Sequence, residues 1–167
     1  MLKALAASAL LLGLAACATP VDSGGQTSQG ETISLAVGPC FGFCPVYSLS
    51  VAPDGAVRFE GERHTTVVGV KEKTVSPQAY QAVARSLAPW RPASGTTAQT
   101  ECEQRASDLP TYTVVWTDGA GQTTTLNHDG GCMSETNRRL KAALQAIPSQ
   151  LGVEPWLERP ANDPNIR

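Results

Sequence analysis

The sequence predicts an α+β fold, in which two β-hairpin units form one antiparallel sheet and two helices pack on one face of it. Apolar and polar residues alternate along two stretches, and a turn rich in Gly, Asp or Pro interrupts each stretch, as in a β-hairpin. Each hairpin is followed by a segment whose apolar residues recur at helical spacing. The order of strands, helix, strands and helix indicates one domain, which we place at residues 32–158.

The first unit contains three predicted β-segments. Residues 33–37 alternate in character and end at a Gly-Pro break, which indicates a first strand. Residues 46–61 predict a hairpin, because two alternating arms flank the Pro-Asp-Gly turn at 53–55. The β-branched stretch 63–75 predicts a further strand of the same sheet.

The second unit begins after residues 91–109, a polar segment that we expect to be a loop. Residues 111–130 predict another hairpin, with a Gly-rich turn and a Thr-rich second arm. The stretch at its end, HDGGC at 128–132, places a His and an Asp beside two glycines. This composition is typical of a turn with solvated side chains, so we expect His128 to lie in a turn.

Each unit ends in a predicted helix with one apolar face. Ser76 can cap the first helix, and Pro89 ends it. Ser134 can cap the second helix, which we expect to end before Pro148. The residues predicted to face the sheet are Tyr80, Val83, Ala84 and Leu87 in the first helix, and Leu140, Ala143, Leu144 and Ile147 in the second.

The first twenty residues, MLKALAASALLLGLAACATP, have the layout of an export signal. Lys3 supplies a positive charge, and the apolar run that follows is too short to span a membrane. The four residues that end at Cys17, Leu-Ala-Ala-Cys, resemble the lipobox of bacterial lipoproteins. The resemblance implies that residues 1–16 are removed and that Cys17 then carries several acyl chains, enough for stable anchoring.

The expected localisation is the outer membrane of a Gram-negative cell, with the domain facing the periplasm. The residue after Cys17 is Ala18 rather than Asp, which favours outer-membrane sorting by resemblance to Gram-negative lipoproteins. Residues 17–31 are predicted to be the lipidated cysteine and a flexible tether, which holds the domain roughly 20 Å from the bilayer. Residues 159–167 are predicted to be a frayed tail.

The charge balance gives no reason to expect a nucleic-acid partner. The chain has 13 basic and 15 acidic residues, and removal of residues 1–16 takes away one basic residue, Lys3, which leaves a net charge of about −3. The partner that the sequence does predict is the membrane, through the N-terminal lipid. A protein or small-molecule partner is not identified.

Four cysteines remain besides the lipidated one, and an even number in an oxidising compartment predicts two disulfides. Four cysteines allow three connectivities, between which the sequence does not choose. We favour the local pairs, Cys40 with Cys44 and Cys102 with Cys132. A crossed arrangement, Cys40 with Cys132 and Cys44 with Cys102, stays open because either bond would tie the two halves of the domain together.

Two segments stand out in the sequence, GPCFGFCPVYSLSVAPDGAVRFEG at 38–61 and DLPTYTVVWTDGAGQTTTL at 108–126. They resemble the family catalogued as domain of unknown function 6438. The likeness covers most of residues 32–148, and its strongest marker is CFGFCPVY at 40–47. The resemblance implies the fold and the architecture, and it implies no activity, because the family has none assigned.

A metal-binding alternative uses two of these cysteines. The spacing C-x-x-x-C-P resembles the copper site of Sco-type delivery proteins, in which two thiolates and a distant histidine suit Cu(I). Cys40 and Cys44 would supply the thiolates, and His64 or His128 the histidine. Those proteins carry the motif in a thioredoxin-like context, whereas hairpins flank it here. A redox role ranks lower, because no helix begins directly after the motif.

The sequence contains no recognisable catalytic set. No motif of a serine hydrolase, a zinc protease or a phosphate-binding loop occurs, and His64 is expected at an exposed position of a strand. Arg138, Arg139 and Lys141 are expected on a solvated helix surface. We therefore predict a lipid-anchored envelope domain that is not an enzyme, with a binding or structural role and with no cofactor or metal ligand. Copper binding through Cys40 and Cys44 is the alternative.

Overall fold

A computed structural model describes residues 30–157 of the chain. The predicted signal peptide, Cys17, the tether as far as residue 29 and the tail at 159–167 lie outside the described residues. Glu31, which the sequence places at the end of the tether, is held by the fold. Its carboxylate accepts a 2.8 Å hydrogen bond from Nε of Arg91, and its carbonyl accepts a 2.8 Å hydrogen bond from the Tyr80 hydroxyl.

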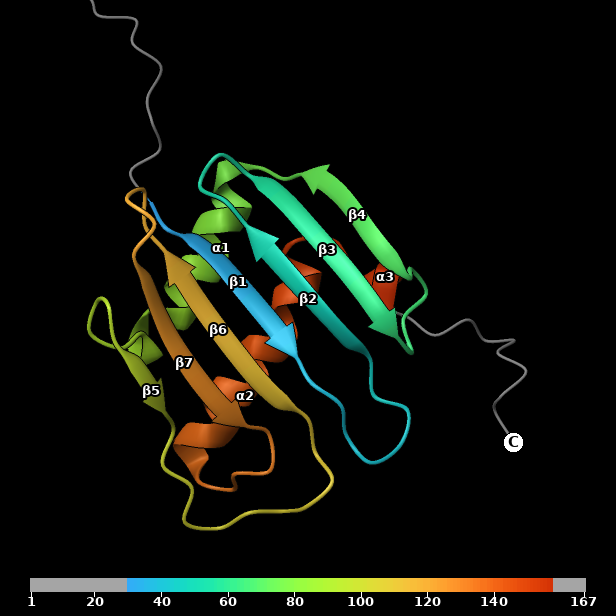
Figure 1. Cartoon of the computed structure of the whole chain (residues 1–167), viewed down its shortest axis with the longest axis vertical. Helices are drawn as coiled ribbons and strands as arrows, with labels where there is room; N and C mark the ends of the chain where they lie inside the picture. The colour runs from blue at the N-terminus through green and yellow to red at the C-terminus, as the bar shows by residue number, and fades with distance from the viewer. Residues whose placement is uncertain (1–29, 158–167) are drawn as a thin grey trace, which may run out of the picture.

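The sheet has seven strands in the order β4-β3-β2-β1-β6-β7-β5 (Figure 1). Strand β1 lies in the middle and pairs antiparallel with β2 on one side and with β6 on the other. Only β5 pairs in parallel, with β7, so the sheet is mixed rather than formed by two hairpins alone. The strands are β1 Thr32–Val37, β2 Val46–Val51, β3 Ala56–Arg63, β4 Gly69–Thr74, β5 Thr97–Gln99, β6 Thr111–Thr117 and β7 Thr123–Asp129.

The helices lie on one face of the sheet (Figure 1). They are α1 Pro77–Leu87, followed by the 3-10 turn η1 Ala88–Trp90, α2 Glu135–Gln150 and α3 Glu154–Leu157. The predicted caps are present, since Oγ of Ser76 accepts from the Ala79 amide and Oγ of Ser134 accepts from the Asn137 amide. No helix of residues 30–157 is long and apolar enough to cross a membrane.

The core lies between this face of the sheet and the helices. Alternate residues of each central strand point into it, so Leu35, Leu49 and Val114 are buried in one continuous cluster. Leu87 of α1 and Leu144 of α2 are both fully buried against the sheet, as predicted. The other face of the sheet carries small polar side chains on the central strands and charged ones, such as Arg58 and Glu60, on β3, as is common for an antiparallel sheet with one solvated face.

Strand β5 is absent from the sequence prediction, which treats residues 91–109 as a loop. The strand forms because the chain runs beside β7, where the Thr125 amide bonds the Thr96 carbonyl at 2.9 Å and the Thr100 amide bonds the Asn127 carbonyl at 3.0 Å. An edge strand of three residues needs little apolar character. The sequence of β5, Thr-Ala-Gln, therefore lacks a recognisable strand pattern.

The predicted strand at 63–75 is wrong in its first half. Residues 64–68 form the connection between β3 and β4, and the strand begins only at Gly69. His64 has a φ of 57°, a left-handed conformation that a strand cannot contain. The Thr65 hydroxyl then donates to the Val67 carbonyl at 2.7 Å, which satisfies a backbone group inside the bend. The β-branched residues of this stretch therefore lie in a turn rather than in a strand.

The prediction that the second helix ends before Pro148 is wrong. Helix α2 continues to Gln150 with Pro148 inside it. A proline lacks the amide that would bond the carbonyl four residues earlier, and in the last turn this costs a single hydrogen bond. The Pro148 ring is buried, and its carbonyl accepts a 2.8 Å bond from the Val153 amide, so the proline connects α2 to the chain that follows.

Candidate functional site

The four cysteines form the two local disulfides that the sequence favours. Cys40 is bonded to Cys44, with Cα atoms 5.8 Å apart, and Cys102 is bonded to Cys132, with Cα atoms 5.3 Å apart. The crossed arrangement is therefore wrong. The copper alternative requires the thiolates of Cys40 and Cys44, and the disulfide occupies both sulfur atoms.

The segment between Gly38 and Pro45, here called the motif loop, projects from one end of the sheet. Gly42 has a φ of 122°, which a residue with a side chain resists. Phe41 is 86% exposed and Phe43 is 55% exposed, although Phe43 contacts the His64 ring edge-on at 5.3 Å between ring centres. The disulfide closes a tight ring, so two large apolar side chains are held at the surface.

A cleft of about 470 Å³ opens beside the motif loop, between the end of the sheet and helices α2 and α3. The cysteine motif, CFGFCPVY at 40–47, contributes Cys44, Pro45 and Tyr47. The start of β6 contributes Tyr112, and the segment just before it contributes Leu109 and Pro110. Helices α2 and α3 supply the opposite wall. The volume lies within the range of small-molecule sites in proteins.

The floor of the cleft is a row of three side chains on adjacent strands. Val37 at the end of β1 is paired with Tyr47 on β2 and with Tyr112 on β6. Both tyrosines are more than nine-tenths buried, and each is held by a ring packed behind it. Tyr47 stacks on Phe59 with ring centres 5.6 Å apart, and Tyr112 stacks on His128 at 6.0 Å.

The polar groups of the cleft include two tyrosine hydroxyls, an amide and an ammonium. Burial raises the pKa of Tyr47 and of Tyr112 above the ordinary value for tyrosine, so both hydroxyls stay protonated. Gln145 of α2 donates to the Tyr112 hydroxyl oxygen at 3.4 Å. Lys141, one turn earlier on α2, is half-buried rather than fully solvated as predicted, and its ammonium donates to the Gly130 carbonyl at 3.0 Å.

His128 is buried, and the prediction that it lies in a turn is wrong. It is the last inward-facing residue of β7, and the turn begins after Asp129. Its Nδ1 lies 3.0 Å from the Thr100 hydroxyl, and its Nε2 has no hydrogen-bond partner in residues 30–157. Burial lowers the pKa of His128, with a smaller opposing effect from Asp129 and a further lowering by Lys141.

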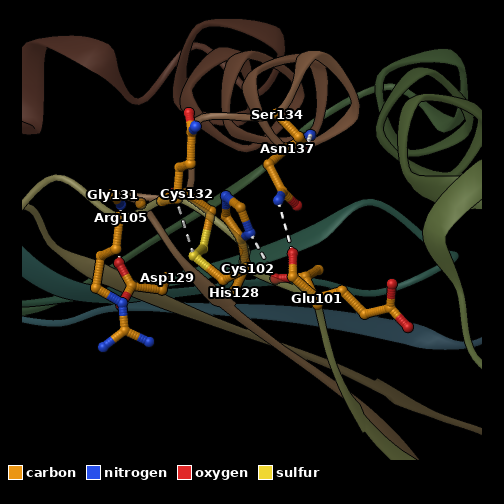
Figure 2. The surroundings of a disulfide bond; sticks show 12 residues. Glu101, Cys102, Arg105, His128, Asp129, Gly131, Cys132, Ser134 and Asn137 are labelled. Carbon is orange, nitrogen blue, oxygen red and sulfur yellow. Dashed lines mark hydrogen bonds and ion pairs between the residues drawn. A yellow bond between two sulfur atoms is a disulfide. The ribbon is translucent and has the colours of Figure 1, made fainter.

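The Cys102–Cys132 disulfide lies beside His128, close to the start of α2 (Figure 2). Asn137 of α2 donates to the Glu101 carbonyl at 2.8 Å, beside the disulfide. Arg105 forms a 3.0 Å ion pair with Asp129 on the other side. These interactions hold the loop before β6 against the beginning of α2. The disulfide therefore lies in a region with several other interactions between distant segments.

His64 is not at the exposed strand position that the sequence predicts. It is half-buried in the bend after β3 and lies against Phe43 of the motif loop. In the described part of the chain, no three His, Cys, Asp or Glu side chains lie close enough together to hold a metal ion. The two histidines have separate neighbours, Phe43 for one and Tyr112 for the other.

The cleft residues were not among the predicted sites, except for Cys44 of the disulfide. They come from segments far apart in the sequence. Cys44, Pro45 and Tyr47 belong to the cysteine motif, and Leu109, Pro110 and Tyr112 belong to the second segment that resembles the family. The cysteine motif predicts sulfur chemistry, and the sequence gives no reason to single out the tyrosine that follows it.

A family model described as Domain of unknown function (DUF6438) matches residues 31–151. This range contains the whole sheet, α1, α2 and most of the residues that line the cleft. A comparison with curated proteins gives no significant match.

Proposed function

The chain belongs to the DUF6438 family, and we propose that it is a lipid-anchored binding domain of the cell envelope whose ligand occupies the cleft beside the motif loop. One observation carries the proposal. Three residues of the motif, Cys44, Pro45 and Tyr47, line the cleft of about 470 Å³, which the motif disulfide borders. A mostly apolar cleft with a few polar groups is the usual form of a small-molecule site.

We propose a binding role rather than catalysis because of the residues that line the cleft. They include no histidine, and their single carboxylate belongs to Glu154, which is exposed. Cys44, the cysteine among them, is held in a disulfide. A nucleophile paired with a base, or a pair of carboxylates, would favour an enzyme.

The described chain enters the domain at the end of the sheet opposite the cleft. Strand β1 starts at Thr32, which follows the tether, and ends at Val37 in the floor of the cleft (Figure 1). In the proposed arrangement, a lipid on Cys17 is joined through the tether to the end of the sheet opposite the cleft. In this arrangement the outer membrane positions the domain, and the ligand comes from the periplasm.

The anchor is tested by the substitution Cys17→Ser. We expect this variant to lose incorporation of a labelled fatty acid and to keep its signal peptide, measured by gel mobility and mass spectrometry. A variant that is processed normally and stays at the membrane would overturn the lipoprotein assignment.

The binding site is tested by filling the cleft. Ser149 of α2 lines the cleft, is exposed and makes no side-chain hydrogen bond in residues 30–157, so Ser149→Trp adds a bulky ring without removing a described contact. Ala142→Trp on the exposed face of the same helix is the matched control. Native mass spectrometry of protein purified from the envelope should show a bound small molecule in the wild type and in Ala142→Trp, and none in Ser149→Trp. Equal occupancy in all three would contradict the proposal.

A further inference from the structure

The cleft contains hydrogen-bond donors that the protein does not use. The Tyr47 hydroxyl makes no hydrogen bond to another residue within 30–157, although the side chain is more than nine-tenths buried. The Tyr112 hydroxyl accepts from Gln145, and its own hydrogen stays available for an acceptor. Two tyrosine O–H groups are therefore ready to donate into the cleft.

Lys141 adds a positive charge to these donors. Its ammonium has three N–H bonds, of which the Gly130 carbonyl takes one. No carboxylate of the described residues forms an ion pair with it, and Glu154, the acid of the cleft, stands at the exposed rim. A half-buried ammonium without a counter-ion favours an anionic ligand.

The remaining walls are apolar and fit a hydrocarbon body. Val37 lies in the floor, Pro45 and Pro110 stand at the two sides, and Pro148 and Leu157 face them from the helices. These side chains offer a ligand no hydrogen bond. Moving a ligand atom from water into contact with these side chains is favourable only if the ligand atom is apolar.

We propose that the cleft binds an amphiphilic monocarboxylate, with the carboxylate on Lys141 and the hydroxyls of Tyr47 and Tyr112, and with the hydrocarbon chain between the apolar walls. The inference rests on the proposed function, because it names the ligand class of the same cleft. A neutral amphiphile would leave the ammonium unpaired. A cationic one would be repelled by the ammonium of Lys141.

Three probes with the same eight-carbon chain test the ligand class: octanoate, octan-1-ol and octylammonium. Binding is measured by isothermal titration calorimetry on the full-length chain in nanodiscs, with empty nanodiscs as the reference for partition into lipid. We expect octanoate to bind at least about tenfold more tightly than either other probe, since a hydrogen-bonded charge pair is worth about one to two powers of ten in affinity.

Lys141→Met removes the charge and keeps the length of the side chain, and we expect it to weaken octanoate binding at least about tenfold. Arg139→Met removes the same charge from the exposed surface of the same helix and should leave the affinity unchanged. Lys141→Arg should restore most of the binding. Because Lys141 also bonds the Gly130 carbonyl, each variant is checked by its melting temperature.

Tyr47→Phe removes one donor and keeps the ring stacked on Phe59, so we expect octanoate to bind about two- to tenfold more weakly. Tyr80→Phe is the control, because its hydroxyl bonds the Glu31 carbonyl at the other end of the domain. An unchanged affinity in Tyr47→Phe and Lys141→Met would overturn the assignment of the carboxylate to these donors.

The outcomes separate this inference from the proposed function. If octanol or octylammonium binds as well as octanoate, and Ser149→Trp abolishes that binding, the carboxylate is wrong and the cleft is still a binding site. If octanoate binds equally to Ser149→Trp, the cleft is not the site and both proposals are wrong. If none of the probes binds, the amphiphilic carboxylate is excluded, and the mass spectrometry of purified protein decides the role of the cleft.

Discussion

The two disulfides join the same kind of atom in very different surroundings. Cys102–Cys132 spans 30 positions, and Cys132 is 2% exposed in a region with several other long-range bonds. Cys40–Cys44 spans four positions at the tip of a projecting loop, where the Phe41 amide bonds the Asp108 carbonyl at 3.2 Å. The first fixes how distant segments meet, and the second fixes the shape of one loop beside the cleft.

The difference shows that the effect of a disulfide depends on the sequence separation of its cysteines and on their surroundings. A bond between distant residues restricts the unfolded chain strongly, whereas a bond between near neighbours restricts it little. The side chains of Phe41 and Phe43 are exposed and contribute little to the core. The motif disulfide therefore contributes mainly to the wall of the cleft, where Cys44 lies.

The largest expected effect is the loss of the long-range disulfide. Replacing both Cys102 and Cys132 by Ala should lower the free energy of unfolding by about 3.5 kcal/mol, because a loop of this length gains that much chain entropy when it is opened. Urea unfolding without reductant, monitored by tryptophan fluorescence, measures the change. A loss below about 1 kcal/mol would show that the neighbouring bonds hold the region without the disulfide.

The matched experiment on the motif disulfide should give a smaller loss of stability and a larger local change. Replacing Cys40 and Cys44 by Ala should cost about 2 kcal/mol at most, because the opened ring is short. Chymotrypsin should then cut faster after Phe41 and Phe43, since the loop is no longer held. The variant without Cys102 and Cys132 serves as the control and should keep the wild-type cleavage rate at these sites under native conditions. Equal rates in both variants would contradict the comparison.

Most of the fold could be predicted because the signals are local. The strand pairs follow from alternation and from the turn at 53–55, where Gly55 has a φ of 88°, and both helix starts follow from a serine cap. Strand β5 could not be predicted, since its pairing with β7 depends on tertiary structure. The end of α2 could not be predicted from Pro148 for a related reason, because a helix can continue through a proline when its last turn is packed.

The cleft could be predicted far less well than the sheet. The motif marks its edge, but Lys141 and Gln145 reach it only because α2 crosses the sheet above Tyr112. His128 shows the same limit. Its neighbours Asp129 and Gly130 have the composition of a turn, and the alternation of Thr124, Leu126 and His128 in β7 prevails over that composition.

The smallest expected effect is a dependence of stability on pH that belongs to the side of the molecule with the long-range disulfide. Burial holds the pKa of His128 below the ordinary value of 6.5, whereas in the unfolded chain the ring binds a proton as the pH falls through that value. Between the two pKa values the unfolded state therefore binds more protons, so stability is full above pH 6.5 and falls as the pH is lowered toward the folded pKa.

One proton limits the slope to about 1.4 kcal/mol per pH unit. Asp129 and Lys141 are the charged groups that act on the ring, and they oppose each other, so burial decides the direction. His128→Phe keeps a ring against Tyr112 and removes the titration, and should flatten the free energy of unfolding between pH 5.5 and 7.5. A wild-type slope in His128→Phe would show that the acid sensitivity does not come from this buried ring, and would remove this difference between the two regions.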